Sequence, residues 1–470
     1  MDDRPERPEI NLGAKKCKDA KAPWFSIVIR IKIAVSKLKI QSLCGCLWGV
    51  LLWVVDPSTA QTVKIRLFEI FHPRRLEIYA AERNVPANGS AAHLTKTSRP
   101  QRISKTENAE RLLISAANVP LFDDAPNWVR IVLANSMLQI QSANASRSLP
   151  LSDTLKISPP HGDYFFAIPG PNDTKQKAKR EKKMAGNSSV AARPYAGALQ
   201  IYVDGDELGV INLTPVEDYL AGVLAAEMPQ AELPALQAQA VVARTYIIKN
   251  WQRHSKDGYQ FCDLTHCQTY KGMAEITPAI RQAVTSTADE ILTFDEQPIE
   301  AYYSSTCGGT TADDAGVWAS EKDQPYLKSV TDGSFCSSSP HYRWRARLSA
   351  DSLHQIWQRR LGDPITSIII TKNGADGRVR ELALMGHSLH LISGEDFRAI
   401  TCRAFGWNTL KSTWFDVQIK KRAYLFTGRG LGHGLGLCQY GAMEMARQGY
   451  SYREILQHYF PGTKIRKPGE

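Results

Sequence analysis

The chain has 470 residues, of which 43% are hydrophobic and 22% charged, a composition typical of two or three globular domains. Its formal net charge of +11 favours an acidic polymer or surface as the partner. The sequence has no zinc finger, P-loop or aromatic-basic RNA motif, so we expect no nucleic-acid partner.

The first 60 residues have the pattern of an export signal. A polar and basic stretch precedes the apolar run Leu43–Val55, which is too short to cross a bilayer comfortably. The small residues Ser58-Thr59-Ala60 then form a cleavage pattern. We therefore expect residues 1–60 to be a signal peptide with a long basic n-region, or a membrane anchor if it stays uncleaved. The protein would then be exported to the periplasm or cell envelope.

Residues 61–171 predict a small β-rich domain. Short runs rich in β-branched and aromatic residues, such as VKIRLFEI and WVRIVLANSMLQIQS, alternate with polar loops. We find no catalytic motif in this region, so we expect a scaffold or substrate-docking role. Residues 172–194 are polar and basic without periodicity, which predicts a flexible linker.

A larger domain over residues 195–470 begins with a hairpin that turns at Gly205 and leads into a helix. Thr214 is suited to cap this helix, with Pro215 at its first position and Glu217 completing a capping box. The rest of the domain mixes strands and helices without βαβ alternation. We therefore predict an α+β fold in which helices and antiparallel strands surround a substrate groove.

Glu227 lies where the first helix of this domain should end, because Pro229 disfavours helical backbone at Met228. Pro234 then begins a second helix, which is rich in alanine. The partial negative charge at a helix C-terminus favours a neutral carboxylic acid, which is what a general acid needs. Spacing alone leaves two other roles open: a solvated surface glutamate, or one paired with Arg244.

Four segments of the domain, in order, resemble the stage II sporulation protein D (SpoIID) family, which includes LytB-type proteins. They are DYLAGVLAAEMP with LQAQAVVARTY, CDLTHCQTYKG, AYYSSTCGGTTADDAGVWAS with PYLKSV, and GRGLGHGLGLCQYGAMEMARQGYSYREILQHYFPGTKI. Together they span Gly197 to Ile465, with core motifs at residues 197–310 and 424–465.

The resemblance implies an exported lytic transglycosylase that cleaves peptidoglycan glycan strands. Sporulation members of the family act on strands already stripped of stem peptides by an amidase, and cleavage leaves 1,6-anhydro-N-acetylmuramic acid ends. The family's catalytic glutamate falls on Glu227. Ordinary glycosidases need two carboxyl groups, but here the muramic 6-hydroxyl is a tethered nucleophile, so one suffices. The alternative is a non-catalytic glycan-binding or amidase-enhancing protein.

The resemblance also suggests supporting residues. Arg244 would orient Glu227 or bind an acidic group, although a structural salt bridge is equally open. His433 would assist proton transfer or bind sugar hydroxyls. The alternative is a structural histidine whose hydrogen bonds are made within a tight turn. The expected substrate-binding side chains are those of Tyr303, Ser304, Ser305 and Gln439.

A cluster of potential metal ligands follows the second helix. His254, Cys262, His266 and Cys267 lie within fourteen residues, and tetrahedral zinc prefers such thiolate and imidazole ligands. Relatives with a zinc near this loop suggest His254, Cys262 and Cys267 as ligands of one structural zinc. A Cys262–Cys267 disulfide, or pairing of either thiol with Cys307, is the alternative.

Overall fold

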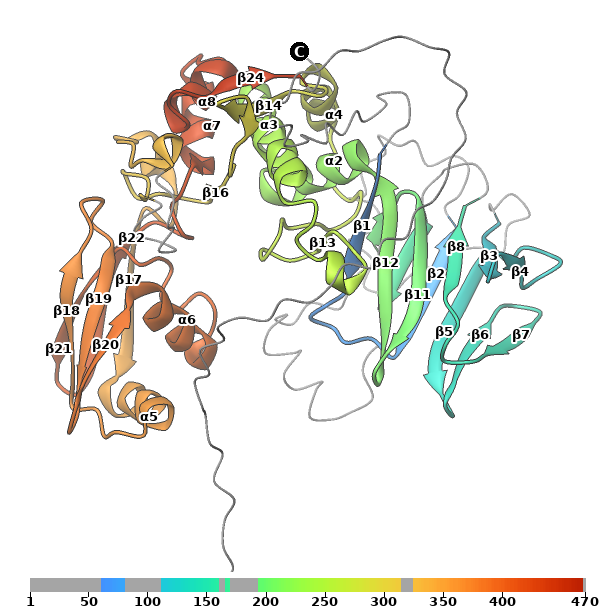
Figure 1. Ribbon diagram of the computed structural model, residues 1–470, viewed down its shortest axis with the longest axis horizontal. Coiled ribbons are helices and arrows are strands. Elements are labelled where there is room, and N and C mark those ends of the chain that lie inside the picture. Colours follow the sequence, from blue (N-terminus) through green and yellow to red (C-terminus); the bar gives the residue numbers. More distant parts are fainter. Residues whose placement is uncertain (1–60, 81–110, 160–164, 170–192, 314–323, 468–470) are drawn as a thin grey trace, which may run out of the picture. The chain divides into compact units, whose positions relative to one another are not determined.

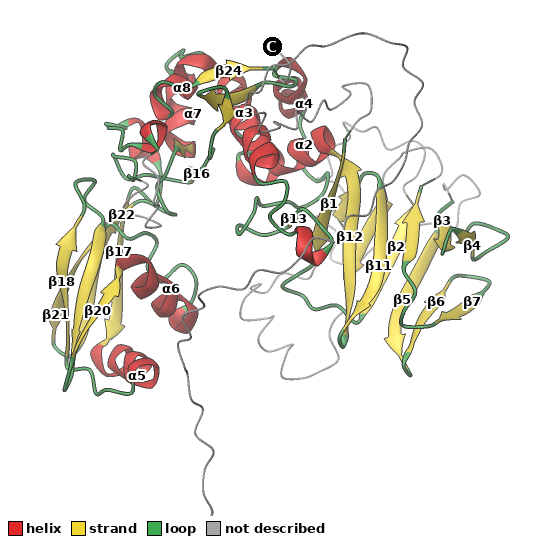
Figure 2. Ribbon diagram, viewed as in Figure 1, coloured by secondary structure: helices red, strands yellow, loops and turns green. Residues whose placement is uncertain are grey.

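The computed structural model describes residues 61–80, 111–159, 165–169, 193–313 and 324–467. The predicted signal peptide and residues 172–192 of the predicted linker lie outside these ranges. Helices and mostly antiparallel sheets occur together, which confirms the predicted α+β class (Figure 2). In the described ranges, no helix combines the length and the apolar character needed to cross a membrane.

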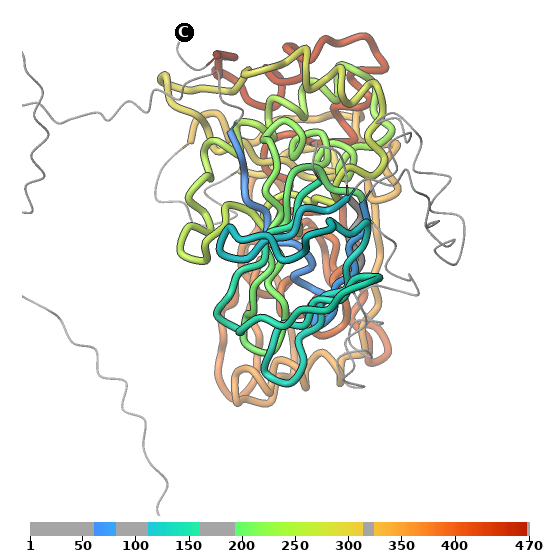
Figure 3. Tube along the Cα trace, turned by 90° about the vertical axis from the view of Figure 1, so that its right-hand side faces the viewer, coloured from blue at the N-terminus to red at the C-terminus, as the bar shows by residue number. Residues whose placement is uncertain are grey.

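A seven-stranded sheet joins the beginning of the described chain to the hairpin that precedes Glu227. Strand β1 pairs antiparallel with β12 and parallel with β13, and Figures 1 and 3 show β1 in blue beside the green hairpin. Strands from residues 61–171 and from residues 195–470 therefore share one sheet. Its strands, in spatial order, are β13 (Phe261–Cys262), β1 (Thr62–Leu67), β12 (Glu207–Pro215), β11 (Ala198–Asp204), β8 (Leu155–Ser158), β3 (Leu113–Ala116) and β4 (Val119–Pro120).

A second, six-stranded sheet is antiparallel and confirms the predicted β-rich N-terminal region. Along its strand β2 the side chains of Leu76, Ile78 and Ala80 are buried and alternate with more exposed ones, the period expected for a sheet with one covered face. Its strands, in spatial order, are β10 (Arg193–Tyr195), β9 (Phe165–Pro169), β2 (Arg75–Ala80), β5 (Trp128–Ala134), β6 (Met137–Gln141) and β7 (Ser146–Leu149).

The predicted pair of helices is present, with its break at Pro229. Helix α2 (Val216–Glu227) ends at Glu227, and α3 (Leu233–Lys249) begins with a proline in its first turn. The predicted capping box is wrong. Thr214 belongs to β12, Pro215 is the N-cap, and no side chain caps the helix. The reason is tertiary, because β1 pairs with β12 as far as Pro215 and keeps Thr214 extended.

Helix α3 lies at the centre of a helical layer, where its alanines allow close packing. It contacts α2, α4 (Pro278–Ser286), α7 (Gln439–Arg447), α8 (Tyr452–Tyr459) and β14. Helix α8 begins with a capping box formed by Ser451 and Glu454. Two small sheets complete this part: β15 (Gln297–Pro298), β14 (Ile291–Phe294) and β24 (Lys464–Arg466), and the parallel pair β16 (Tyr303–Ser304) and β23 (Leu437–Cys438).

Residues 343–429 build a second hydrophobic core of their own. Trp357 from α5 stacks on Phe397 from α6 with ring centroids 5.5 Å apart. The Ser393 side chain caps α6 by accepting the N–H of Asp396. The elements are β17 (Arg343–Ser349), α5 (Ala350–Leu361), β18 (Ser367–Asn373), β19 (Val379–Met385), β20 (Leu389–Ser393), α6 (Gly394–Phe405), β21 (Phe415–Lys420) and β22 (Ala423–Arg429).

The shared seven-stranded sheet makes a stability prediction. Ile65 is fully buried between β12 and β13. Ile65→Ala should lower the free energy of unfolding by about 2–5 kcal/mol, because it removes core contacts and leaves a cavity. The exposed Thr62→Ala control in the same strand should change it by less than about 0.5 kcal/mol. Urea unfolding followed by circular dichroism measures both. A transition in which the Ile65→Ala chain loses only the N-terminal strands would contradict a sheet that folds as one unit.

Candidate functional site

Two donors from distant parts of the chain hold the carboxylate of Glu227. The backbone N–H of Thr269 donates to its Oε1 at 2.9 Å, and the Gln439 side-chain amide donates to its Oε2 at 3.3 Å. Glu227 remains partly exposed, whereas Gln439 is only 6% exposed. The carboxylate is therefore fixed in orientation, and part of it stays open to solvent.

The parallel pairing of β16 with β23 explains why Gln439 reaches Glu227. Ser304 lies opposite Cys438 in this pair, and Gln439 follows as the first residue of α7. The N–H of Tyr440 also donates to the carbonyl of Ser305, at 3.1 Å. The predicted substrate-binding residues Tyr303, Ser304 and Ser305 thus lie on the backbone that positions Gln439.

These three residues differ in their exposure. The hydroxyl of Ser304 is buried and makes no hydrogen bond within the described residues, so it does not face solvent. Tyr303 and Ser305 keep partial exposure. The Tyr303 hydroxyl donates to Gln268 Oε1 at 3.2 Å. Burial, and then the nearby charge of Glu227, raise the pKa of Tyr303 well above its ordinary value, so this phenol stays protonated. The groove expected around Glu227 stays a prediction.

The contacts of Arg244 favour the structural role that the sequence left open. Its guanidinium, from a side chain only 3% exposed, binds both carboxylate oxygens of Glu217, at 3.0 and 2.8 Å. It also donates to the carbonyls of Val284, Thr287 and Glu290. This fork ties the first turn of α2 to α3, to the end of α4 and to the segment after α4. Arg244 therefore supports the helix that carries Glu227.

His433 is held in its neutral form. Its Nδ1 accepts the N–H of Leu435 at 3.0 Å, which places the proton of the neutral ring on Nε2. Burial, and then the positive charges of Arg378 and Arg398, lower its pKa from 6.5 to about 4. A neutral imidazole can donate one hydrogen bond, for example to a sugar hydroxyl. A role of His433 in proton transfer stays a prediction.

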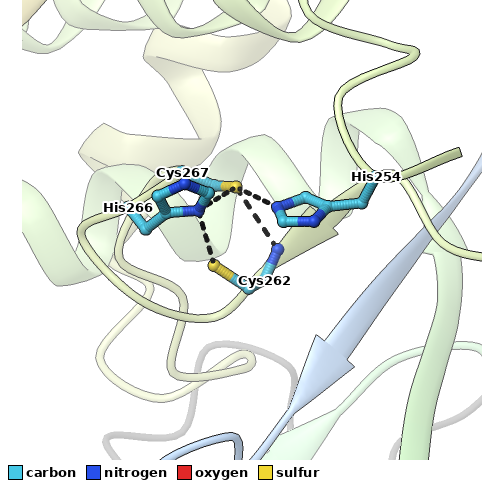
Figure 4. Close-up of side chains that lie close together, drawn as sticks. All are labelled: His254, Cys262, His266 and Cys267. Carbon is cyan, nitrogen blue, oxygen red and sulfur yellow. Dashed lines mark hydrogen bonds between the residues drawn. The ribbon is translucent and has the colours of Figure 1, made fainter. Parts of the chain in front are cut away.

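The predicted cluster of metal ligands assembles in space. One ligand atom each from His254, Cys262, His266 and Cys267 lies within 4.8 Å of the others (Figure 4). Cys267 Sγ lies 3.3 Å from His254 Nε2, and Cys262 Sγ lies 3.7 Å from His266 Nδ1. All six cysteines in the described ranges are free thiols, so neither a Cys262–Cys267 disulfide nor a bond to Cys307 is formed.

This donor set fits a tetrahedral metal. The structure adds His266 to the three ligands expected, which gives two sulfur and two nitrogen donors. Asp257 Oδ2 lies 3.3 Å from His254 Nδ1, so it can orient the ring with Nε2 toward the cluster. A hydrogen bond from Cys262 lowers the pKa of Cys267 to about 7, which favours its thiolate form. The cluster ends two residues before Thr269, so a bound metal would also fix the loop whose N–H binds Glu227.

Comparison with known proteins matches two parts of the chain to family models. A family model described as "Stage II sporulation protein" matches residues 204–294, which include Glu227 and the Cys/His cluster. A second model, described as a domain of unknown function (DUF8618), matches residues 334–436, around the second core.

Two relatives have the same name and similar coverage. The chain is 33% identical over 267 residues to stage II sporulation protein D of Bacillus subtilis (strain 168), covering 53% of this chain and 74% of that protein. The protein of that name in Bacillus amyloliquefaciens gives the same identity and coverage. The amidase enhancer of B. subtilis is 29% identical over 367 residues, which cover 65% of this chain and 50% of the enhancer.

The low pKa of His433 predicts a pH dependence of stability. Between pH 6.5 and about 4, the unfolded chain binds a proton on this ring that the folded chain does not bind. Unfolding therefore takes up a proton, and stability falls as the pH is lowered through this window. In His433→Asn the loss of stability over this pH window should be smaller. The asparagine side-chain oxygen can still accept the Leu435 N–H. Urea unfolding of both proteins at several pH values measures the difference, and equal slopes would contradict it.

Proposed function

The chain belongs to the stage II sporulation protein D family, and from this premise we propose that it is an exported lytic transglycosylase that uses Glu227 to cleave peptidoglycan glycan strands. The observation that carries the proposal is the carboxylate of Glu227, partly exposed and held by the Thr269 N–H and the Gln439 amide. A group fixed in this way can stay aligned with a bound glycosidic bond.

In the first half of the reaction, Glu227 acts as general acid. Each of its oxygens has one of the two donors, so a lone pair remains on each to carry the catalytic proton. Protonated Glu227 gives this proton to the glycosidic oxygen as the bond to the muramic C1 breaks. Positive charge then develops on the sugar ring, and the substrate's own N-acetyl group stabilises it.

In the second half, Glu227 acts as general base. The ionised carboxylate removes the proton of the muramic 6-hydroxyl, whose oxygen bonds to C1 and closes the 1,6-anhydro ring. Because the nucleophile is tethered to the same sugar, no second carboxylate is needed to activate water. Glu227 ends the cycle protonated and ready for the next strand.

The other residues of the site bind and position. Gln439 orients Glu227 and has a second amide proton for a sugar hydroxyl. Tyr303 and Ser305 supply further hydroxyl groups on the neighbouring segment. A zinc ion held by His254, Cys262, His266 and Cys267 would be structural, since four protein ligands leave no open position.

Family membership and charge support a cell-wall setting for the proposed reaction. A net charge of +11 suits anionic cell-wall glycan in the periplasm or cell envelope. A cell-wall amidase is the partner, since it supplies strands without stem peptides. The similarity to a protein named amidase enhancer supports this link. It also supports the second candidate, a protein that binds glycan and stimulates the amidase without cleaving.

The test is digestion of purified glycan, intact and amidase-treated, with the full chain and with Glu227→Gln. Anhydro-muramic ends, counted by mass spectrometry, should form with the wild type and fall at least about 100-fold in the variant, since the amide cannot transfer the proton. Glu232→Gln is the matched control. This substitution removes the same negative charge five residues after Glu227. Because the Glu232 carboxylate binds Arg447, activity should persist.

Binding to the same glycan separates the two candidate functions. Both Glu227→Gln and the wild type should co-sediment with it, because the amide preserves the shape of the site. Binding without any anhydro ends from the wild type, on either substrate, would reject the transglycosylase and leave the amidase enhancer.

The Cys/His cluster makes a prediction about metal. Cys267→Ser should lower the zinc content by about one ion per chain, and should destabilise the fold by several kcal/mol, since structural zinc contributes roughly 10 kcal/mol in small zinc domains. Elemental analysis and thermal unfolding measure these effects. Cys402→Ser is the control, because the Cys402 thiol lies outside the cluster and forms hydrogen bonds with the backbone of Leu410. Unchanged zinc in Cys267→Ser would contradict the assignment.

A further inference from the structure

A second cluster of metal-ligand side chains lies in the main core, and the proposed function does not use it. Cys307, Asp332, Cys336 and Cys438 are all fully buried, and one ligand atom from each lies within 4.8 Å of the others. We propose that these four residues form a second, structural metal site for a thiophilic divalent ion, with zinc as the best fit. The assignment does not depend on the glycan reaction.

The donor set and its spacing fit tetrahedral coordination. Three thiolates and one carboxylate oxygen make four ligands, as in closed structural zinc sites. The sulfurs of Cys307 and Cys336 lie 3.6 Å apart. This is far longer than the roughly 2.05 Å of a disulfide. It matches the edge of about 3.7–3.8 Å between two thiolates that each lie about 2.3 Å from one zinc.

Hydrogen bonds already hold the ligands in place. The N–H of Cys307 donates to the sulfur of Cys438 at 3.2 Å, which favours the thiolate that a metal requires. Asp332 Oδ2 accepts the N–H of Cys336 at 3.0 Å, and its Oδ1 accepts the hydroxyl of Tyr459 from α8. These bonds are the outer shell that orients a ligating carboxylate.

Charge gives an independent reason for a cation here. Asp332 is fully buried, and none of the described residues forms an ion pair with it. The guanidinium of Arg378 reaches the same region, but it donates to the carbonyl of Cys307 and pairs with Asp376. An ionised carboxylate is costly to bury unless a cation neutralises it, and a divalent metal would supply that charge.

A disulfide explains the cluster less well. Joining Cys307 to Cys336 would leave the third thiol, Cys438, and the Asp332 carboxylate buried without a role. A metal uses all four groups at once. The ligands also come from separate places: the loop after β16, the short helix η5 (Phe335–Ser338) with the residues before it, and β23. Binding would therefore close long loops, where a cross-link stabilises most.

The location connects this site to Glu227. Cys438 is the N-cap of α7 and immediately precedes Gln439, whose amide binds Glu227. Cys307 follows the Tyr303–Ser305 segment by two residues. The bound ion would thus hold in place both segments that position the Glu227 carboxylate, the start of α7 and Tyr303–Ser305.

Metal content of the purified full chain tests the proposal. The wild type should hold about two zinc ions per chain, one in each cluster. Cys267→Ser should keep about one ion, Cys336→Ser should also keep about one, and the double variant should hold none. Cys402→Ser, a buried thiol outside both clusters, should keep both ions.

Cobalt(II) identifies the ligands spectroscopically. In the Cys267→Ser chain, bound cobalt should show thiolate charge-transfer absorption. Adding Asp332→Asn to this chain should weaken the binding of cobalt in titrations. Adding Cys336→Ser should abolish the absorption. If the Cys336→Ser chain fails to fold, the metal content of the wild type and of Cys267→Ser still decides. A Cys267→Ser chain without metal, or a Cys307–Cys336 disulfide found by peptide mass spectrometry in unreduced protein, would overturn the second site.

Discussion

The fixed carboxylate of Glu227 is the constraint on which the site depends. It sits at the end of α2, and its two donors come from positions 42 and 212 residues further along the chain. Neither donor is useful unless the loop at Thr269 and the start of α7 are both held in place. Much of the surrounding structure serves this purpose: Arg244 anchors the first turn of α2, and the β16–β23 pair presents Gln439.

Each of the two clusters of ligand-type side chains lies close in sequence to one of the two donors to this carboxylate. The first, from His254 to Cys267, ends two residues before Thr269. The second includes Cys438, one residue before Gln439. Each donor to Glu227 therefore follows a potential metal ligand closely. Bonds from a metal to these ligands would hold the loop at Thr269 and the junction between β23 and α7 at Gln439.

Two comparisons show how tertiary contacts changed local expectations. Thr214, Pro215 and Glu217 form a good capping box in sequence, but β1 holds Thr214 in a strand and Arg244 takes the Glu217 carboxylate. Tertiary contacts also decide the role of Arg244. A five-donor fork suits a substrate anion or a buried carbonyl network equally, and only the position of the segment after α4 decides between them.

The sequence by itself determined what short-range chemistry controls. It placed the break between α2 and α3 at Pro229, the α+β class and the candidate glutamate; the break is local because proline acts on its immediate neighbours. Only the tertiary structure decided that β1 joins β12, that His266 completes the first cluster, and that Cys307, Asp332, Cys336 and Cys438 meet. These contacts join residues far apart in the chain, and long-range packing, which no local pattern encodes, brings them together.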